Sequence, residues 1–276
     1  MFVYKKWEKF CKNLYENKIQ STTAYGALKD KKENFLILKH DVETNPQKAL
    51  AMAKIENKYG HCGVYYVQAY LLESKENIDI LKKIKELGHE VSYHHDVMDS
   101  NSGDLAKALE EFETNKATFE KHGFNINTVC QHGNPVVQRV GYTSNRDFFR
   151  SQQVKEKFNE IAEIMVDYRE KIGVDFKYIS DAGYGWKIIY DPETNDIVDS
   201  SDKDIKLKAL DKVLDFIKNE NAVILSTHPH RWNSNLVSAV IKNIIFKTIR
   251  FIAKVLKKIP IINKIMSKFY FLAKKI

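Results

Sequence analysis

The chain alternates short apolar runs with longer helix-like segments, and this alternation constrains its fold more than any other feature. Seven runs are rich in β-branched or aromatic residues, which favours strands. They are 35–40, 63–68, 90–95, 127–132, 176–180, 186–190 and 222–228. Helices are predicted at 46–59, 75–87, 102–121, 152–172 and 202–219. This order predicts an α/β protein with repeated strand–helix units around a mostly parallel sheet or barrel.

Positive charge is concentrated at the C-terminal end. Residues 240–276 contain ten Lys and Arg and no acidic residue, which leaves 34 basic against 36 acidic residues in 1–239. The body is therefore nearly neutral, and no nucleic-acid partner is predicted. Apolar residues recur at helical spacing in the tail, between the lysines. This pattern is typical of a basic amphipathic helix on an anionic membrane, although packing on the barrel exterior is an alternative.

Cysteine usage and the N-terminal sequence bear on the compartment. The three cysteines, Cys11, Cys62 and Cys130, are odd in number and have no metal-like spacing, so no disulfide framework is predicted. The first twenty residues carry lysines and lack the apolar core of a signal peptide. We therefore expect a cytoplasmic protein that contacts the inner face of the membrane peripherally through its tail.

Imidazoles and carboxylates follow the predicted strands at the ends where each strand stops. In α/β folds these C-terminal ends converge on the substrate. Asp and neutral His are also common ligands of Zn²⁺ and similar divalent ions. The sequence therefore predicts a polar site, with a metal, at this edge of the sheet. The residues concerned are His40, Asp41, His94, His95, Asp96, His132, Asp181 and His228.

Five short motifs resemble those of the polysaccharide deacetylases. They are 40-HD-41, 88-GHEVSYHHDVM-98, 131-QHGNP-135, 181-DAGYGW-186 and 225-LSTH-228, and the resemblance covers about residues 35–232. The first motif is similar to that of an HDVD-type branch associated with surface-polysaccharide gene clusters. The resemblance implies an incomplete (β/α)7 barrel at 35–239, between an N-terminal helical extension at 1–34 and the helical tail at 240–276.

The same resemblance implies a metal-dependent hydrolase that removes acetyl groups from a sugar or glycan precursor. It makes Asp41 and His94 ligands of a divalent ion, which we expect to be Zn²⁺. Met98 stands where the family has its second metal-binding histidine. A thioether is a poor ligand for such an ion, so His132 is the expected third ligand and His228 the competing candidate.

The remaining site roles follow from these positions. The resemblance implies that His40 stands in place of the family's general-base aspartate. His228 is the expected acid, and Asp181 is expected to hold an imidazole in one tautomer. Substrate contacts are expected from five further residues, Tyr93, Arg146, Tyr184, Trp186 and Trp232. Because the motifs depart from the family pattern, a second reading stays open: a non-catalytic carbohydrate-binding or scaffold protein on the same barrel.

Overall fold

The predicted strands form one curved sheet in the computed structural model, which describes residues 2–134, 137–181, 185–189, 205–207, 209–242, 244–245 and 248. All seven predicted strands are present, with ends shifted by at most a few residues. Within the described residues the strands are β1 (Ser21–Thr22), β2 (Phe35–Val42), β3 (Val64–Val67), β4 (Glu90–His95), β5 (Thr128–Gln131), β6 (Ala162–Glu163), β7 (Lys177–Ser180), β8 (Trp186–Ile189), β9 (Ile205–Leu207) and β10 (Ala222–Thr227).

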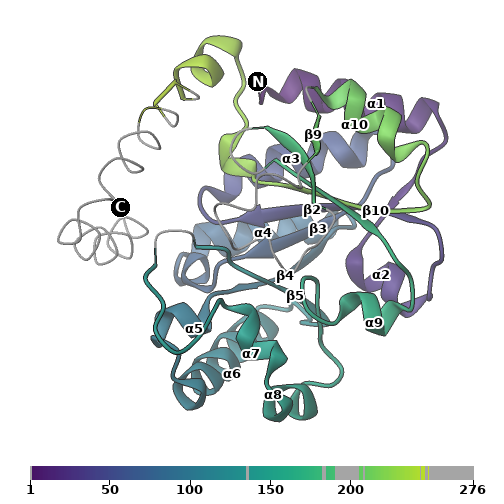
Figure 1. Ribbon diagram of the computed structural model, residues 1–276. Helices are drawn as coiled ribbons and strands as arrows, with labels where there is room; N and C mark the ends of the chain where they lie inside the picture. The colour runs from purple at the N-terminus through teal and green to yellow at the C-terminus, as the bar shows by residue number, and fades with distance from the viewer. Residues whose placement is uncertain are drawn as a thin grey trace.

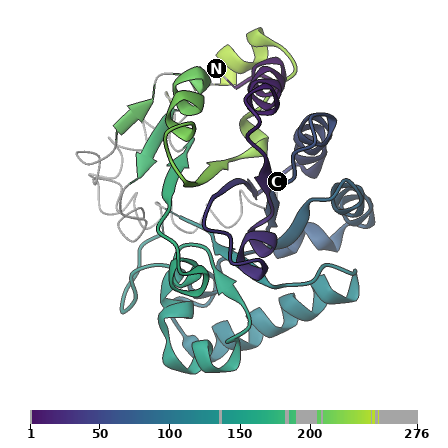
Figure 2. The same ribbon diagram turned by 90° about the vertical axis from the view of Figure 1, so that its right-hand side faces the viewer.

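The sheet has the order β6-β5-β4-β3-β2-β10-β7-β8-β9, with β1 pairing beside β2. The pairs from β6 to β7 are parallel, whereas β8 and β9 run antiparallel. The sheet curls into an incomplete barrel with helices around its outside (Figures 1 and 2). The predicted α/β barrel class is thereby confirmed. The parallel strands also bring their C-terminal ends to one rim, as the site prediction requires.

Helices cover the outer surface of the barrel. Asn45 caps α3 by accepting a hydrogen bond from the Lys48 amide, and Ser74 caps α4 in the same way. The described helices are α1 (Tyr4–Glu16), α2 (Ala24–Lys29), α3 (Pro46–Lys58), η1 (Ala69–Glu73), α4 (Lys75–Glu86), α5 (Val97–Ser100), α6 (Leu105–Lys121), α7 (Arg146–Arg150), α8 (Gln152–Lys157), α9 (Tyr168–Ile172), α10 (Leu210–Ile217) and η4 (Pro229–Arg231).

Apolar side chains fill both faces of the sheet, as expected of parallel strands covered by helices. Inside the barrel, Ile37, Tyr66, Tyr178 and Ile224 belong to one buried cluster. Outside it, α1, α3 and α10 contribute to a second cluster and α4 to α6 to a third. Alternate residues of each strand therefore point to different compartments. This alternation decides which polar residues reach the site.

Two predicted helices are wrong in extent. The segment 152–172 contains α8, the short strand β6 and α9, and the segment 202–219 contains β9 before α10. At Glu163 the backbone N–H donates to the Asp167 carboxylate, and Glu163 itself accepts from the Gln131 and Met165 amides. Because these side chains capture backbone groups, they compete with a continuous helix.

The N-terminal segment packs into the barrel domain. Strand β1 pairs with β2, and Trp7, Phe10 and Leu14 of α1 are buried in the second cluster. The predicted tail at 240–276 lies mostly outside the described residues. The described part of the chain has a helix from 236 through 242. None of the described helices has the length and apolar character that crossing a bilayer requires.

Candidate metal centre

Consecutive residues of β2 face opposite sides of the sheet. Lys39 and Asp41 point into the barrel, whereas His40 points outward to the helix layer, because side chains alternate along a strand. Both inward residues are buried, with the Asp41 side chain 9% exposed. Glu43, the next acidic residue in the same direction, follows the end of β2 and is half-buried at the rim.

Lys39 and Asp41 form an ion pair inside the barrel. The Lys39 Nζ atom lies 2.5 Å from Asp41 Oδ1 and 3.3 Å from Ser226 Oγ, and it lies over the Tyr66 and Tyr178 rings. Burial would raise the pKa of Asp41, but the Lys39 ammonium holds it well below its ordinary value. Asp41 is therefore an anion whose charge is already balanced by a fixed cation.

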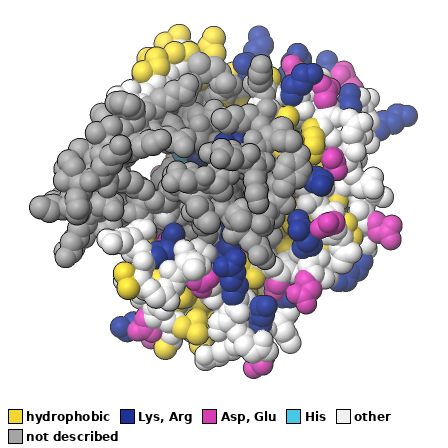
Figure 3. All heavy atoms as spheres, in the orientation of Figure 1, with side chains coloured by type: hydrophobic (Ala, Val, Ile, Leu, Met, Phe, Trp, Pro, Cys, Tyr) yellow, Lys and Arg dark blue, Asp and Glu magenta, His cyan; other side chains and the backbone are white. Residues whose placement is uncertain are grey.

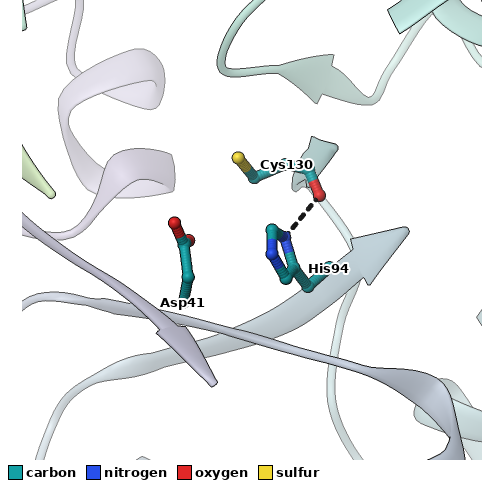
Figure 4. Close-up of side chains that lie close together, drawn as sticks. All are labelled: Asp41, His94 and Cys130. Carbon is teal, nitrogen blue, oxygen red and sulfur yellow. Dashed lines mark hydrogen bonds between the residues drawn. The ribbon is translucent and has the colours of Figure 1, made fainter. Parts of the chain in front are cut away.

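His94, on β4, has a defined tautomer. Its Nδ1 atom lies 2.9 Å from the Cys130 carbonyl oxygen, which only accepts, so Nδ1–H donates and Nε2 keeps its lone pair (Figure 4). Burial lowers the pKa of His94 to about 4, so the imidazole is neutral near pH 7. A backbone carbonyl bonded to one ring nitrogen is the usual arrangement behind a metal-binding histidine.

His94 belongs to two groups of close ligand atoms. The inner group is Asp41, His94 and Cys130, and the outer group is Glu43, His94 and His132; within each, the ligand atoms lie within 4.8 Å of one another. In the outer group, His132 Nδ1 lies 3.3 Å from His94 Nε2 and 3.4 Å from Glu43 Oε1. The structure thus brings the predicted ligands around His94, but it places Asp41 and His132 in different groups.

His228 and Asp181 form a dyad at the same rim. Nδ1–H of His228 donates to Asp181 Oδ1 across 2.6 Å, and the His228 amide donates to Oδ2. Burial would raise the pKa of Asp181, but Arg231 and His228 lower it to about 2. The other ring nitrogen, Nε2, lies 3.7 Å from Glu43 Oε1 and 3.8 Å from Asp41 Oδ2. His228 therefore presents an oriented nitrogen to both carboxylates of the site.

The expectation that His40 lies in this pocket is wrong. Its side chain is fully buried between the sheet and the helices, with Nε2 2.9 Å from Glu56 Oε1 and its ring stacked on Tyr65 at 4.2 Å. Glu56 also accepts from Trp7 Nε1 and from the Tyr65 hydroxyl. His40 therefore belongs to a structural network behind the strand.

The expected substrate contacts are also placed elsewhere. Tyr93 packs on Phe112 in the helix layer, since it faces outward from β4 as His40 does from β2. Trp186 and Trp232 are buried against Phe2, at ring distances of 5.6 and 5.1 Å. These three rings offer no open face to a sugar.

The two remaining predicted substrate contacts are Arg146 and Tyr184. Arg146 is fully buried, and its positive charge opposes the rise in the pKa of Glu163 that burial causes. Tyr184 lies outside the described residues. The predicted substrate contacts therefore gain no support from the described part of the chain.

Four residues of the site were missed in the sequence. Glu43 and His230 approach each other at the rim, with His230 Nδ1 3.8 Å from Glu43 Oε2, while Lys39 and Cys130 lie deeper. A signal was present: Lys39, Asp41 and Glu43 share one face in a two-residue period, as do Cys130 and His132. Strict use of that period would have selected Lys39, Glu43 and Cys130 and would have rejected His40.

Comparisons with known proteins give distant structural neighbours. No family model and no curated protein matches the chain. Among solved structures, the catalytic domain of a peptidoglycan N-acetylglucosamine deacetylase from Eubacterium rectale aligns at 13% identity and a TM-score of 0.44, covering 78% of this chain and 84% of that one. The peptidoglycan deacetylase PdaC from Bacillus subtilis aligns at 13% identity and a TM-score of 0.37, covering 83% and 98%.

Proposed function

We propose that this protein is a metal-dependent deacetylase that hydrolyses an acetyl group on a sugar or glycan precursor. One observation carries the proposal: the Asp181–His228 dyad presents its free Nε2 next to Glu43, within the group of donors around His94. An oriented imidazole beside a group of metal-binding donors is the arrangement that hydrolysis of an amide or ester requires.

The donors fit a divalent ion such as Zn²⁺. Neutral imidazoles and a carboxylate are its usual ligands, and the His94 tautomer leaves Nε2 available. His94 and His132 would hold the ion, together with a carboxylate from the end of β2. An ion bound there would polarise the acetyl carbonyl and acidify a water molecule.

The dyad provides the proton transfers. With His40 in the helix layer, His228 is placed to take a proton at Nε2 from the attacking water and to return it to the departing nitrogen or oxygen. The Asp181 carboxylate stabilises the imidazolium that forms between these two steps, because it accepts from Nδ1–H. The His228 side chain is 14% exposed, so substrate at the rim can reach it.

The binding-only alternative has less support. Sugar-binding sites commonly use exposed aromatic faces, and the described candidates Trp186 and Trp232 are buried. The test is acetate release from a panel of N- and O-acetylated sugars by metal-loaded protein. We expect release from at least one member. Tight sugar binding without any acetate release would instead favour the binding protein.

We also propose the setting of this activity from the sequence resemblance. The HDVD-type motif suggests surface-polysaccharide assembly at the cytoplasmic face of a membrane, with the body at 35–239 and the tail at 240–276 as separate functional units. Exposed apolar residues where the helix starting at 236 leads into the tail support membrane contact. Leu236, Val237, Ile241, Ile244 and Ile245 are between 51% and 69% exposed. In Figure 3, hydrophobic side chains lie at the top of the molecule, where Figure 1 draws the yellow-green helix that leads into the tail.

A further inference from the structure

We propose that the metal ligands are Glu43, His94 and His132, and that Asp41 serves as the fixed counter-ion of Lys39 instead of as a ligand. This inference rests on the proposed metal dependence of the site. It concerns which of the two donor groups around His94 holds the ion. The two groups differ in charge, in the occupation of their oxygen atoms and in access from solvent.

The inner group already contains a cation. Lys39 Nζ lies 2.5 Å from Asp41 Oδ1, and the second oxygen accepts from the Ser226 hydroxyl at 3.4 Å. A divalent ion bound to Asp41 would lie close to this buried ammonium, with little solvent to screen the repulsion.

The third member of the inner group is also unfavourable. The Cys130 side chain is buried, and its thiol donates to the Gln131 carbonyl oxygen at 3.5 Å. Asp41, His94 and Cys130 are all buried, which gives an ion little access.

The outer group differs in its carboxylate. Among the described residues, the Glu43 carboxylate has no Lys or Arg partner and faces only imidazoles, those of His132, His228 and His230 at 3.4 to 3.8 Å. Its side chain is 26% exposed, which leaves a path for an ion and for substrate. A carboxylate without a cation, surrounded by nitrogen donors, is the environment that a divalent ion would neutralise.

The position of His132 is consistent with this assignment. Its Nδ1 atom lies 3.3 Å from His94 Nε2, which carries a lone pair because Nδ1 of His94 donates to Cys130. Asn145 donates to the His132 carbonyl, and the His132 amide donates to His95, so the backbone is held. Two ring nitrogens and Glu43 Oε1 therefore converge on one place at the rim.

The test compares two variants for Zn²⁺ affinity, measured by competition with a chelator on the full chain. Glu43→Gln keeps the shape of the side chain and removes its charge. Substitutions of residues that only support a metal ligand can weaken metal affinity by roughly 100-fold. We expect Glu43→Gln, which changes a ligand itself, to weaken Zn²⁺ binding by at least as much. Asp41→Asn alone would leave Lys39 unpaired, so the matched variant is Lys39→Met/Asp41→Asn, which removes both charges together. We expect it to bind Zn²⁺ within a few-fold of wild type.

The reverse pattern, with strong binding by Glu43→Gln and loss in the double variant, overturns the assignment while leaving metal dependence intact. Loss of binding in Cys130→Ser also overturns it, because only the inner group contains the thiol. If wild type binds no divalent ion, both this assignment and the proposed function fail. Binding that follows the expected pattern without acetate release keeps the ligand set and removes the function. Thermal unfolding of each variant establishes that it is folded.

Discussion

Nδ1 of His228 lies 2.6 Å from Oδ1 of Asp181, so residues from the ends of neighbouring strands β10 and β7 form one hydrogen-bonded dyad. Arg231 Nη1 donates to the same Asp181 oxygen, Oδ1, at 2.7 Å and helps to hold the carboxylate in place. The dyad defines which nitrogen of His228 faces the donor groups. It therefore links the fold directly to the proposed chemistry.

Replacing Asp181 should separate proton transfer from metal binding. In Asp181→Asn the amide no longer stabilises the imidazolium and can favour the wrong tautomer, so we expect turnover to fall by roughly 10²–10⁴-fold. Zn²⁺ affinity should stay near that of wild type, because Asp181 is not among the donors around His94. The measurements are acetate release and chelator competition. A loss of metal with little loss of turnover per bound ion would make Asp181 part of the metal centre.

Replacing His40 should affect stability instead of turnover. His40→Leu leaves the buried Glu56 carboxylate without its closest imidazole, and leaving a buried polar group without a partner costs roughly 1–3 kcal/mol. In His40→Gln the amide can still donate to Glu56, so a smaller loss is expected. Urea unfolding and turnover of the folded protein measure the two effects. A 10²-fold loss of turnover in a stable His40→Gln protein would return His40 to the site.

Glu163 should make stability decrease with rising pH. Burial raises its pKa from 4.5 to about 7, so the folded protein retains a proton that the unfolded chain releases. Its contribution is complete below pH 4.5 and is lost as the pH rises through about 7, a change of roughly 3 kcal/mol. Glu163→Gln should flatten the unfolding free energy over this range, whereas Glu160→Gln, at a nearby exposed position, should not. If the unfolding free energy of Glu163→Gln falls with pH as steeply as that of wild type, Glu163 is not the source of the pH dependence.

Removing residues 240–276 should weaken binding to anionic vesicles by at least tenfold, since each basic residue near such a surface contributes about 1 kcal/mol. The variant Ile241→Ser/Ile244→Ser/Ile245→Ser keeps every charge and should weaken binding through lost apolar contact. Vesicle co-sedimentation at two salt concentrations measures the electrostatic and the apolar contributions to binding. If the truncated chain is insoluble and the full chain does not bind vesicles, the tail packs on the barrel.

The strands were predictable because each is a compact apolar run, and the parallel order followed from the helices between them. The segment 152–172 was not, because β6 pairs with β5, and Glu163 accepts from the Gln131 amide of that neighbouring strand. Local sequence cannot reveal such a partner. The helix-like sequence pattern of this segment was outweighed by these contacts.

The site was predictable in its location and only partly in its members. Polar residues at strand ends identified the rim, and the structure places Asp41, His94, His132, Asp181 and His228 there. His40 was misassigned because its position in the motif outweighed the alternation of β2. The same alternation would have selected Glu43, whereas the approach of His230 to Glu43 depends on the turn after β10, which no local pattern encodes.

The most direct test of the proposed function is acetate release as a function of bound metal. The protein is stripped with a chelator and reloaded in steps with Zn²⁺, and metal content and acetate release from the acetylated sugar panel are measured on the same samples. We predict no release from the stripped protein and release that rises in proportion to Zn²⁺ up to about one ion per chain. Acetate release that is unchanged by stripping, or its absence at full metal occupancy, would contradict a metal-dependent deacetylase.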